Sequence, residues 1–247
     1  MMNIKVAASY SEDKVLEIIE AFGHSGKTYW KKRNTIKVFE IGDKKWNVKS
    51  FQVPHLVNRF AYKYVRKSKA RRSFEHAEIL LNKGILTPKP IGYIEYSKLV
   101  GLTNSFYISE NLSYDFDFGE VIDKEFPDRE NILNQFTEFT YQIHENNIHH
   151  FDHSKGNTLM CRTSEGQYDF YLIDLNRMRF EEMTYEKRID NFNRLSLSPD
   201  MIQIVGKKYA SLIGQDEHQV IDDIKKSCEK FKEFAHRKGR WKKRIGL

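Results

Sequence analysis

The chain has 247 residues, with 41 Lys and Arg against 34 Asp and Glu, so its formal net charge is +7. Hydrophobic residues make up 40% and charged residues 30%, a balance that excludes an intrinsically disordered chain. With only 5 Pro and 13 Gly, collagen-like and low-complexity chains are excluded as well.

The positive charge is concentrated in two short segments. Residues 63–72 contain six basic residues and no acidic one, and residues 236–247 contain six more, again without an acid. Without these twelve, 29 basic residues face 34 acidic ones, which gives the rest of the chain a net charge of −5. Two basic segments on an acidic body favour docking to a particular anionic surface over general binding to nucleic acid.

The sequence predicts neither a secretory leader nor a membrane span. Met1 to Tyr10 contain no apolar run of signal-peptide length. No window approaches the ~18 consecutive apolar residues that a spanning helix needs. Cys161 and Cys228 match no metal or redox spacing, so we expect reduced thiols and a cytosolic protein.

The first part of the chain is predicted to consist mainly of strands. A helix is expected after Ser11, a suitable N-cap, because Val15 to Phe22 have helical apolar spacing. Strand-like runs lie at Asn3–Ala8, Thr28–Lys32, Thr35–Ile41 and Lys45–Phe51.

Two helices and two strands are predicted next. Apolar residues at helical spacing predict one helix at Pro54–Lys67 and a second at Ser73–Asn82, which ends before Gly84. The strands are expected at Pro90–Tyr96 and Ser105–Ser109.

The second half of the chain is predicted to be mostly helical. Glu130–Glu145 has a strong helical pattern, and the chain from about Tyr185 onward is expected to be mainly helix. Between them lie a His-rich loop, a short strand at Thr158–Cys161 and a strand at Tyr168–Asp174. A strand-rich half followed by a helical half predicts an α+β protein with two lobes.

The most informative pattern lies at residues 150–157 and 172–174. Asp152 is followed by Asn157, then by a predicted hairpin, and then by Asp174 at the end of an apolar strand. This order is typical of the catalytic half of a protein-kinase-like site. There, one carboxylate orients the attacking hydroxyl or accepts its proton, and an amide oxygen and a second carboxylate hold Mg²⁺ against the phosphates.

The other half of such a site is expected upstream. Lys49 follows Val48 on a predicted strand, which is where a kinase carries the lysine that binds the α- and β-phosphates. Considered alone, each of these residues has a simpler explanation as a sheet-edge charge or a loop cap. Their order and placement on the expected elements favour a site for phosphoryl transfer.

The glutamate that pairs with Lys49 should lie on the next core helix, where Glu75 and Glu78 compete. In the kinase fold, the residue four positions after this glutamate packs into an apolar spine. That residue is Ile79 for Glu75. For Glu78 it is the polar Asn82, so Glu75 is the preferred partner.

Three histidines surround the predicted catalytic aspartate. His149, His150 and His153 with Asp152 form a candidate metal cluster. No fourth ligand is evident nearby, so we expect some of these rings to orient the loop backbone through hydrogen bonds instead.

With these motifs in place, the sequence resembles the lipopolysaccharide kinase (Kdo/WaaP) family of the protein-kinase-like superfamily. The resemblance extends over about Asn34 to Phe180 and includes the segments around Lys49, Asp152 and Asp174. Two further matching segments are Leu86–Gly92 and Tyr107–Glu110. It implies a bilobal protein-kinase-like fold, with a small β-rich N-lobe at residues 1–112 and a mainly helical C-lobe at residues 113–247.

The resemblance also implies an activity. The implied enzyme is an ATP- and Mg²⁺-dependent kinase that phosphorylates a lipopolysaccharide inner-core sugar, and the expected acceptor is the acidic sugar Kdo on lipid A. Asp152 is then the base, Lys49 the phosphate anchor and Glu75 its partner. The predicted Mg²⁺ ligands are Asn157 and Asp174. Residues 109–112 would form the hinge that receives adenine, with the nucleotide-binding positions Glu110 and Leu112.

Several departures from the protein-kinase pattern bear on the acceptor. The turn Lys31–Asn34 is basic rather than Gly-rich, and Phe151 stands where kinases carry an Arg. Asp174 is followed by Leu-Asn rather than Phe-Gly, and we find no Ala-Pro-Glu segment downstream. These departures fit a small-molecule or glycolipid kinase better than a protein kinase, and they leave open a weakly active or inactive member.

The two basic segments are candidate contacts with an anionic membrane. The predicted Pro54–Lys67 helix has an apolar stripe beside basic residues, and Trp241 lies among cations near the C-terminus. Packing on the protein or simple solvation explains either segment equally well. We expect an anionic glycolipid as the partner, membrane contact through residues 59–72 and 237–244, and no specific nucleic acid. The implied location is cytoplasmic, peripherally bound to the inner membrane of a Gram-negative bacterium.

Two alternatives remain open at this point. An enzyme of the same fold could phosphorylate a protein or a small soluble molecule. The chain could also be a pseudokinase or a basic membrane adaptor without activity, although such a module has no need for all five polar residues of the predicted site.

Overall fold

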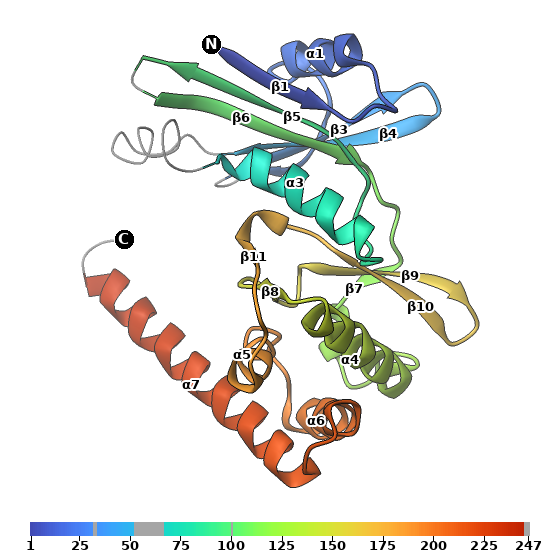
Figure 1. Cartoon of the computed structure of the whole chain (residues 1–247), viewed down its shortest axis with the longest axis vertical. Helices are drawn as coiled ribbons and strands as arrows, with labels where there is room; N and C mark the ends of the chain where they lie inside the picture. Colours follow the sequence, from blue (N-terminus) through green and yellow to red (C-terminus); the bar gives the residue numbers. More distant parts are fainter. Residues whose placement is uncertain (32–33, 52–66, 100, 245–247) are drawn as a thin grey trace. The chain divides into compact units, whose positions relative to one another are not determined.

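The computed structural model describes residues 1–31, 34–51, 67–99 and 101–244, with the backbone alone for residues 242–244. The chain divides into two compact units (Figure 1). Unit 1 comprises Met1–Ser113 and Asp174–Asn176, and unit 2 comprises Tyr114–Ile173 and Arg177–Leu247. The predicted Pro54–Lys67 helix lies outside the described residues except at Lys67 itself.

Unit 1 is built on a six-stranded antiparallel sheet with the strand order β1-β5-β6-β4-β3-β2. The alternation of apolar and polar residues that predicted strands here is typical of a sheet whose strands are covered unequally on their two faces. The strands are β1 (Met2–Val6), β2 (Lys27–Lys31), β3 (Asn34–Ile41), β4 (Lys44–Phe51), β5 (Pro90–Lys98) and β6 (Gly101–Glu110).

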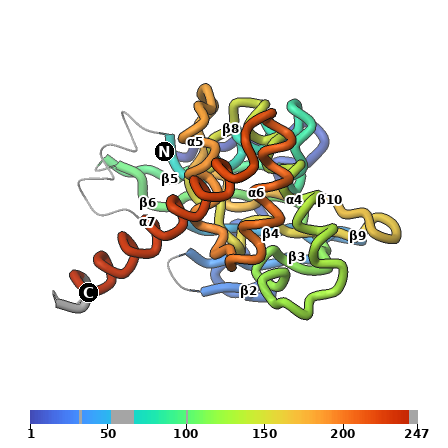
Figure 2. The backbone as a smooth tube through the Cα atoms, turned by 90° about the horizontal axis from the view of Figure 1, so that it is seen from below, coloured from blue at the N-terminus to red at the C-terminus, as the bar shows by residue number. Residues whose placement is uncertain are grey.

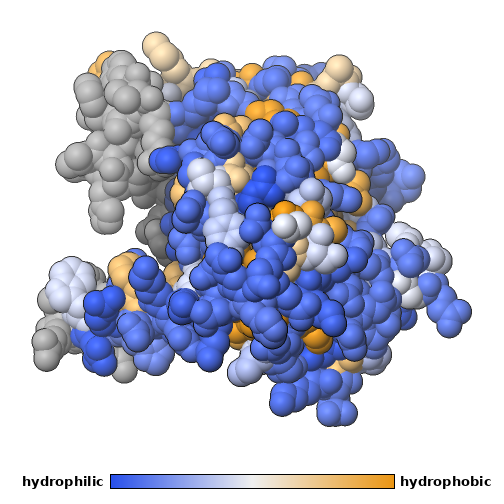
Figure 3. Space-filling view, turned by 60° about the horizontal axis from the view of Figure 1, so that its bottom comes forward, coloured by the Kyte–Doolittle hydropathy of each residue, from blue (hydrophilic) through white to orange (hydrophobic). Residues whose placement is uncertain are grey.

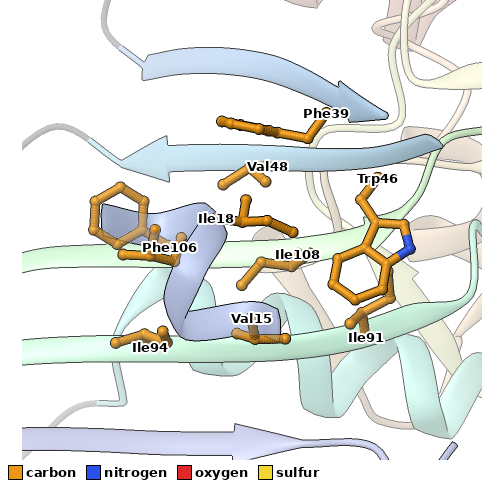
Figure 4. Packing of buried hydrophobic residues seen from close by; sticks show 10 residues of the cluster. Val15, Ile18, Phe39, Trp46, Val48, Ile91, Ile94, Phe106 and Ile108 are labelled. Carbon is orange, nitrogen blue, oxygen red and sulfur yellow. The ribbon is translucent and has the colours of Figure 1, made fainter. Parts of the chain in front are cut away.

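Helix α1 (Glu12–Ala21) covers one face of this sheet. The hydroxyl of Ser11 accepts a hydrogen bond from the backbone N–H of Lys14 at 3.3 Å, which confirms the predicted N-cap. The buried side chains of α1 pack against inward-facing residues of β3 to β6, as Figure 4 shows. This cluster consists of Val15, Ile18, Ile19, Phe39, Trp46, Val48, Ile91, Ile94, Phe106 and Ile108.

Helix α3 (Lys69–Asn82) packs against β4, β5 and β6 through a separate apolar cluster. This second cluster contains Phe51, Ala70, Phe74 and Tyr93. Side chains alternate between the faces of a strand, so Phe51 and Val48 on β4 lie in different clusters. The helix begins one turn earlier than the predicted Ser73, because the Ser68 hydroxyl caps it by accepting from the Arg71 N–H at 3.1 Å.

Unit 2 combines short β-pairs with four helices and one 3₁₀ turn among its described residues. Its strands form a three-stranded sheet in the order β10-β9-β7 and a separate β11-β8 pair. These strands are β7 (Phe116–Asp117), β8 (Ile148–His150), β9 (Thr158–Ser164), β10 (Gln167–Leu172) and β11 (Met178–Phe180). The helices are η1 (Glu120–Ile122), α4 (Arg129–Glu145), α5 (Tyr185–Asp190), α6 (Pro199–Ile213) and α7 (Glu217–Arg244). A further 3₁₀ turn, η2 (Leu175–Arg177), crosses the boundary between the units.

The core of unit 2 forms around α4, which packs against α6. The predicted apolar stripe of α4 is buried, with Ile132, Leu133 and Phe136 fully enclosed. His144 on the same helix is also buried, and its ring nitrogens bond the Tyr209 hydroxyl at 2.6 Å and the Asn191 side-chain oxygen at 3.2 Å. The core therefore includes a polar network whose hydrogen bonds are satisfied.

Helix α7 changes character along its length. Its first half packs on α5 and α6 through Val220, Ile224 and Cys228. From Lys232 to Trp241 every residue is exposed, and Figure 2 shows this end of the helix extending away from α4 and α6. Hydrophilic residues dominate the molecular face in Figure 3, with apolar residues scattered among them. None of the described helices is both long enough and apolar enough to cross a membrane.

The contact between α6 and α7 depends on a glycine. A Cβ added at Gly206 would lie 2.6 Å from Cγ1 of Ile221 and 3.1 Å from its Cα. We expect Gly206→Ala to lower the free energy of unfolding by about 1–3 kcal/mol, because overpacking outweighs the higher helix propensity of alanine. Urea unfolding followed by circular dichroism measures the change.

Gly239→Ala is the matched control, since this helical glycine has no atom within 4 Å of the added Cβ. It should leave stability unchanged or raise it slightly. Equal stability of the two variants would contradict close packing at Gly206.

Candidate functional site

Two of the predicted site residues meet in unit 1. Lys49 lies on β4, on the face opposite its buried neighbour Val48, and its ammonium group is 2.6 Å from Oδ1 of Asp174. Both side chains are largely shielded, with 15% of Lys49 and 29% of Asp174 exposed. The predicted phosphate anchor and a predicted metal ligand therefore form an ion pair in this structure.

The backbone at Asp174 has an unusual conformation. Its φ angle is +57°, in the left-handed region that non-glycine residues rarely adopt. The side-chain amide of Asn176 donates a hydrogen bond to the same Oδ1 of Asp174 at 2.6 Å. Such conformations persist only where the surroundings hold them, and they cluster at functional sites.

Helix α3 helps to keep the backbone at Asp174 in this conformation. Nδ1 of His76 lies 2.7 Å from the carbonyl oxygen of Leu175, and the Arg72 guanidinium donates to the carbonyl oxygen of Asn176 at 2.7 Å. Arg72 belongs to the basic segment in which we predicted a membrane contact. One member of that segment is thus engaged in fixing the backbone next to Asp174.

The structure does not bring Glu75 to Lys49. The Glu75 carboxylate instead accepts from Arg71 at 2.9 Å and from Lys67 at 2.8 Å. Burial alone would raise the pKa of Glu75, but these two hydrogen bonds outweigh burial and lower it. Glu78 pairs with Lys5 at 3.1 Å. Within the part of the chain described, neither glutamate contacts Lys49, so the Lys49–Glu75 pair stays a prediction.

The predicted hinge lies at the end of β6. The Glu110 carboxylate accepts from the Tyr10 hydroxyl at 3.0 Å, and burial together with this hydrogen bond raises the pKa of Tyr10 to about 12. The backbone N–H of Glu110 donates to the carbonyl oxygen of Lys89, and the backbone N–H of Asn111 donates to the carbonyl oxygen of Lys45. Leu112 is half-buried. The side chain of Glu110 is thus engaged within unit 1, and the nucleotide contacts of Glu110 and Leu112 stay predictions.

Unit 2 holds the predicted catalytic loop, between β8 and β9. The backbone N–H of Asp152 donates to Nδ1 of His150 at 3.0 Å, the kind of loop-orienting bond that the sequence predicted for these histidines. The side-chain amide nitrogen of Asn157 donates to the carbonyl oxygen of Asp152 at 2.8 Å and to the Ser154 hydroxyl at 3.2 Å. The loop is therefore held largely by its own polar groups.

Two arginines that the sequence analysis did not identify bind the Asp152 carboxylate. Arg177 reaches Oδ2 at 3.3 Å, and Arg194 reaches Oδ1 at 3.2 Å. Arg177 lies three residues after Asp174, so its position in the sequence gave a weak indication that it belongs to the site. The position of Arg194 gave no such indication, because this residue comes close to Asp152 only in the folded chain.

The two predicted metal ligands match the chemistry of Mg²⁺, which prefers oxygen donors. Asp174 supplies a carboxylate, and the two bonds of Asn157 use its amide nitrogen, which leaves the amide oxygen for a cation. Among the described residues, no group of three or more His, Cys, Asp or Glu side chains could hold a metal on its own.

Comparison with known proteins identifies a family. The model of the lipopolysaccharide kinase (Kdo/WaaP) family matches residues 23–215 of this chain, which confirms the resemblance found in the sequence. No curated protein matches the chain in a sequence search.

A solved structure has the same fold. WaaP in complex with acyl carrier protein matches with a TM-score of 0.64 and 16% identity, over 92% of this chain and 98% of that chain. This likeness confirms the predicted α+β, protein-kinase-like fold. The Rio2 kinase–ADP/Mg²⁺–phosphoaspartate complex from Chaetomium thermophilum matches with a TM-score of 0.48 and 13% identity, over 89% and 75% of the two chains.

Two buried histidines predict how stability depends on pH. Burial lowers the pKa of both His144 and His153 to about 3, whereas the unfolded chain binds these protons near pH 6.5. Acid therefore favours the unfolded state, and stability should fall as the pH drops below about 6.5. The upper limit is about 1.4 kcal/mol per pH unit for each histidine.

Urea unfolding at several values between about pH 5 and about pH 7 measures this slope. His144→Gln should make the slope shallower, whereas His218→Gln, at an exposed position of α7, should leave it unchanged. Parallel slopes for His144→Gln and the wild type would contradict a neutral buried ring.

Proposed function

Because the chain belongs to the lipopolysaccharide kinase (Kdo/WaaP) family, we propose that it phosphorylates Kdo on lipid A at the cytoplasmic face of a membrane. Family membership confirms the coarser prediction, that of an ATP-dependent phosphotransferase acting on the lipopolysaccharide core. Kdo as the acceptor, Mg²⁺ as the metal and the membrane location are the proposed parts.

The observation that carries the proposal is the ion pair between Lys49 and Asp174 at 2.6 Å. A shielded ammonium and a shielded carboxylate each need a partner of opposite charge. ATP with Mg²⁺ would offer phosphate oxygens to Lys49 and a cation to Asp174, so both groups exchange one favourable partner for another.

Asp152 has the role of the base in this proposal. It takes the proton of the acceptor hydroxyl while that oxygen forms a bond to the γ-phosphorus of ATP. The bond between the γ-phosphorus and the β–γ bridging oxygen breaks, and ADP leaves with the electron pair. Lys49 holds the α- and β-phosphates. Asn157 and Asp174 would hold Mg²⁺, which would supply positive charge to neutralise the phosphates.

Removal of the proposed base tests this assignment. We expect Asp152→Asn to lower kcat by about 10²–10⁴-fold, because the amide cannot accept the proton. Lys49→Met and Asp174→Asn should also abolish most transfer. The assay is transfer of radiolabelled γ-phosphate from ATP to Kdo–lipid A in the presence of Mg²⁺.

Asp169→Asn is a suitable control, since Asp169 lies on β10 in the same unit and has no proposed role in transfer. It should retain activity. The proposal is wrong if well-folded wild-type protein transfers no phosphate to any lipopolysaccharide precursor, and binding of Mg-ATP without transfer would favour a pseudokinase.

The exposed half of α7 supports contact with a membrane. Residues 232–241 carry Arg237, Lys238 and Arg240, and the aromatic side chains of Phe234 and Trp241 are 53% and 61% exposed. Aromatic and basic residues on one helix suit the interface of an anionic bilayer. In the other basic segment, residues 59–66 lie outside the described residues, while Lys67 and Arg71 are paired with Glu75.

Charge reversal on α7 tests the membrane contact. We expect Lys238→Glu with Arg240→Glu to weaken binding to anionic vesicles at least about tenfold, since each basic residue near such a surface contributes ~1 kcal/mol. Co-sedimentation with vesicles of phosphatidylglycerol and phosphatidylethanolamine measures it. Raised salt should weaken vesicle binding more than nucleotide binding.

Lys225→Glu, in the packed first half of α7, is the control and should have a smaller effect on vesicle binding. Unchanged vesicle binding by the double variant would exclude this end of the helix as the contact. Acyl carrier protein, with which the structural relative WaaP was solved, is a further candidate partner, and a binding measurement in solution tests it.

A further inference from the structure

The carboxylate of Asp152 lies between two guanidinium groups. Arg177 and Arg194 each reach a different oxygen, at 3.3 and 3.2 Å. Their side chains are 54% and 38% exposed, whereas that of Asp152 is 22% exposed. One arginine is enough to neutralise one carboxylate, so the cluster carries an excess positive charge that faces solvent.

Each arginine has a second contact besides the one with Asp152, through the backbone in Arg177 and through the guanidinium in Arg194. The carbonyl oxygen of Arg177 accepts from the backbone N–H of Phe151 at 2.9 Å, which ties Arg177 to the catalytic loop. The guanidinium of Arg194 lies over the ring of Phe231, 4.8 Å from its centroid. Cations held in position near a reactive group are suited to binding an anion without a large loss of side-chain entropy.

The arginines also have donors to spare. Each contact with Asp152 uses one terminal nitrogen, Nη1. A guanidinium carries five N–H donors in a planar fork, so the same group can bridge Asp152 and a second oxyanion. An anion bound there would lie next to the group that takes the acceptor proton.

We propose that Arg177 and Arg194 bind an anionic substituent of the acceptor, a carboxylate or a phosphate carried near the hydroxyl that is phosphorylated. This rests on the proposed function, in which Asp152 is the base. An acceptor that already carries negative charge is repelled both by Asp152 and by the phosphates of ATP. Two arginines beside the base offset that repulsion, and they orient the hydroxyl toward Asp152.

The position of Phe231 supports an acceptor with a lipid part. Phe231, Phe234, Lys238 and Trp241 fall on one face of α7, since they are three or four residues apart along the helix. The ring beneath Arg194 is thus the first member of the face that ends at the exposed Trp241. An anionic head group at the arginines and an apolar tail near this face would suit one amphipathic acceptor.

A different explanation is that the arginines only position Asp152. In that case their loss lowers kcat for every acceptor and leaves the KM for the acceptor unchanged. Binding of an anion on the acceptor predicts the opposite, a rise in the acceptor KM that depends on whether the acceptor carries the anion.

The test compares Arg177→Gln and Arg194→Gln with Arg179→Gln in the full-length protein. Arg179 has the same charge and a nearby position, but it contacts Phe151 and Glu181 rather than Asp152. We expect the first two variants to raise the KM for Kdo–lipid A about 10- to 100-fold, the usual effect of losing a charge-assisted hydrogen bond. The KM for ATP should not change, and Arg179→Gln should match the wild type. Arg177 is the safer position, because its exposed side chain has no part in the core.

Two modified acceptors show which anionic group the arginines bind. One has the Kdo carboxylate reduced to an alcohol, and the other has the lipid A phosphates removed. The acceptor on which Arg177→Gln no longer costs affinity identifies the group that the arginines bind. An equal penalty on all acceptors, or a loss in kcat alone, would overturn the inference while leaving the kinase assignment intact. Absence of transfer by the wild type would instead refute the proposed function.

Discussion

The ion pair between Lys49 and Asp174 is the interaction on which the candidate site depends. A shielded lysine is tolerated on β4 only because a carboxylate meets it, and that carboxylate comes from a segment more than a hundred residues later in the chain. The segment 174–176 is in turn held by Arg72 and His76 of α3. The N-terminal sheet, the helix packed on it and a short piece of the C-terminal half therefore form one compact unit. Within it, the strained backbone at Asp174 keeps its conformation.

The catalytic loop is held by a different kind of interaction. The site in unit 1 depends on an ion pair, whereas the backbone of residues 150–157 forms hydrogen bonds with neutral side chains, chiefly those of His150 and Asn157. The buried His153 stays uncharged because burial lowers its pKa, and it stacks on Phe136 of α4. Charge is thus confined to the exposed side of the loop, where Asp152 meets its two arginines.

Much of the fold could be predicted because its signals are local. Alternating apolar residues located β3 and β4, and Ser11 located the start of α1. The β8–β11 pair was missed, since three-residue strands contain too few residues for a pattern.

In the site, the order of Lys49, Asp152, Asn157 and Asp174 pointed to phosphoryl transfer, as the family match supports. Arg194 could not be found, because its contact with Asp152 joins residues 42 positions apart and arises only on folding. The pairing of Glu75 with Lys67 and Arg71, and of Glu78 with Lys5, was not predicted either, since the partners of charged side chains depend on tertiary packing.

The short segment 174–176 also has a topological consequence. It belongs to unit 1, whereas the chain on either side of it belongs to unit 2, so the backbone passes from one unit to the other three times. A single break in the chain therefore cannot yield two complete units. A fragment that ends at Ser113 lacks the carboxylate that neutralises Lys49, and a fragment that begins at Tyr114 carries those three residues without the helix that holds them. The two units are thus inseparable in sequence, although each has its own core.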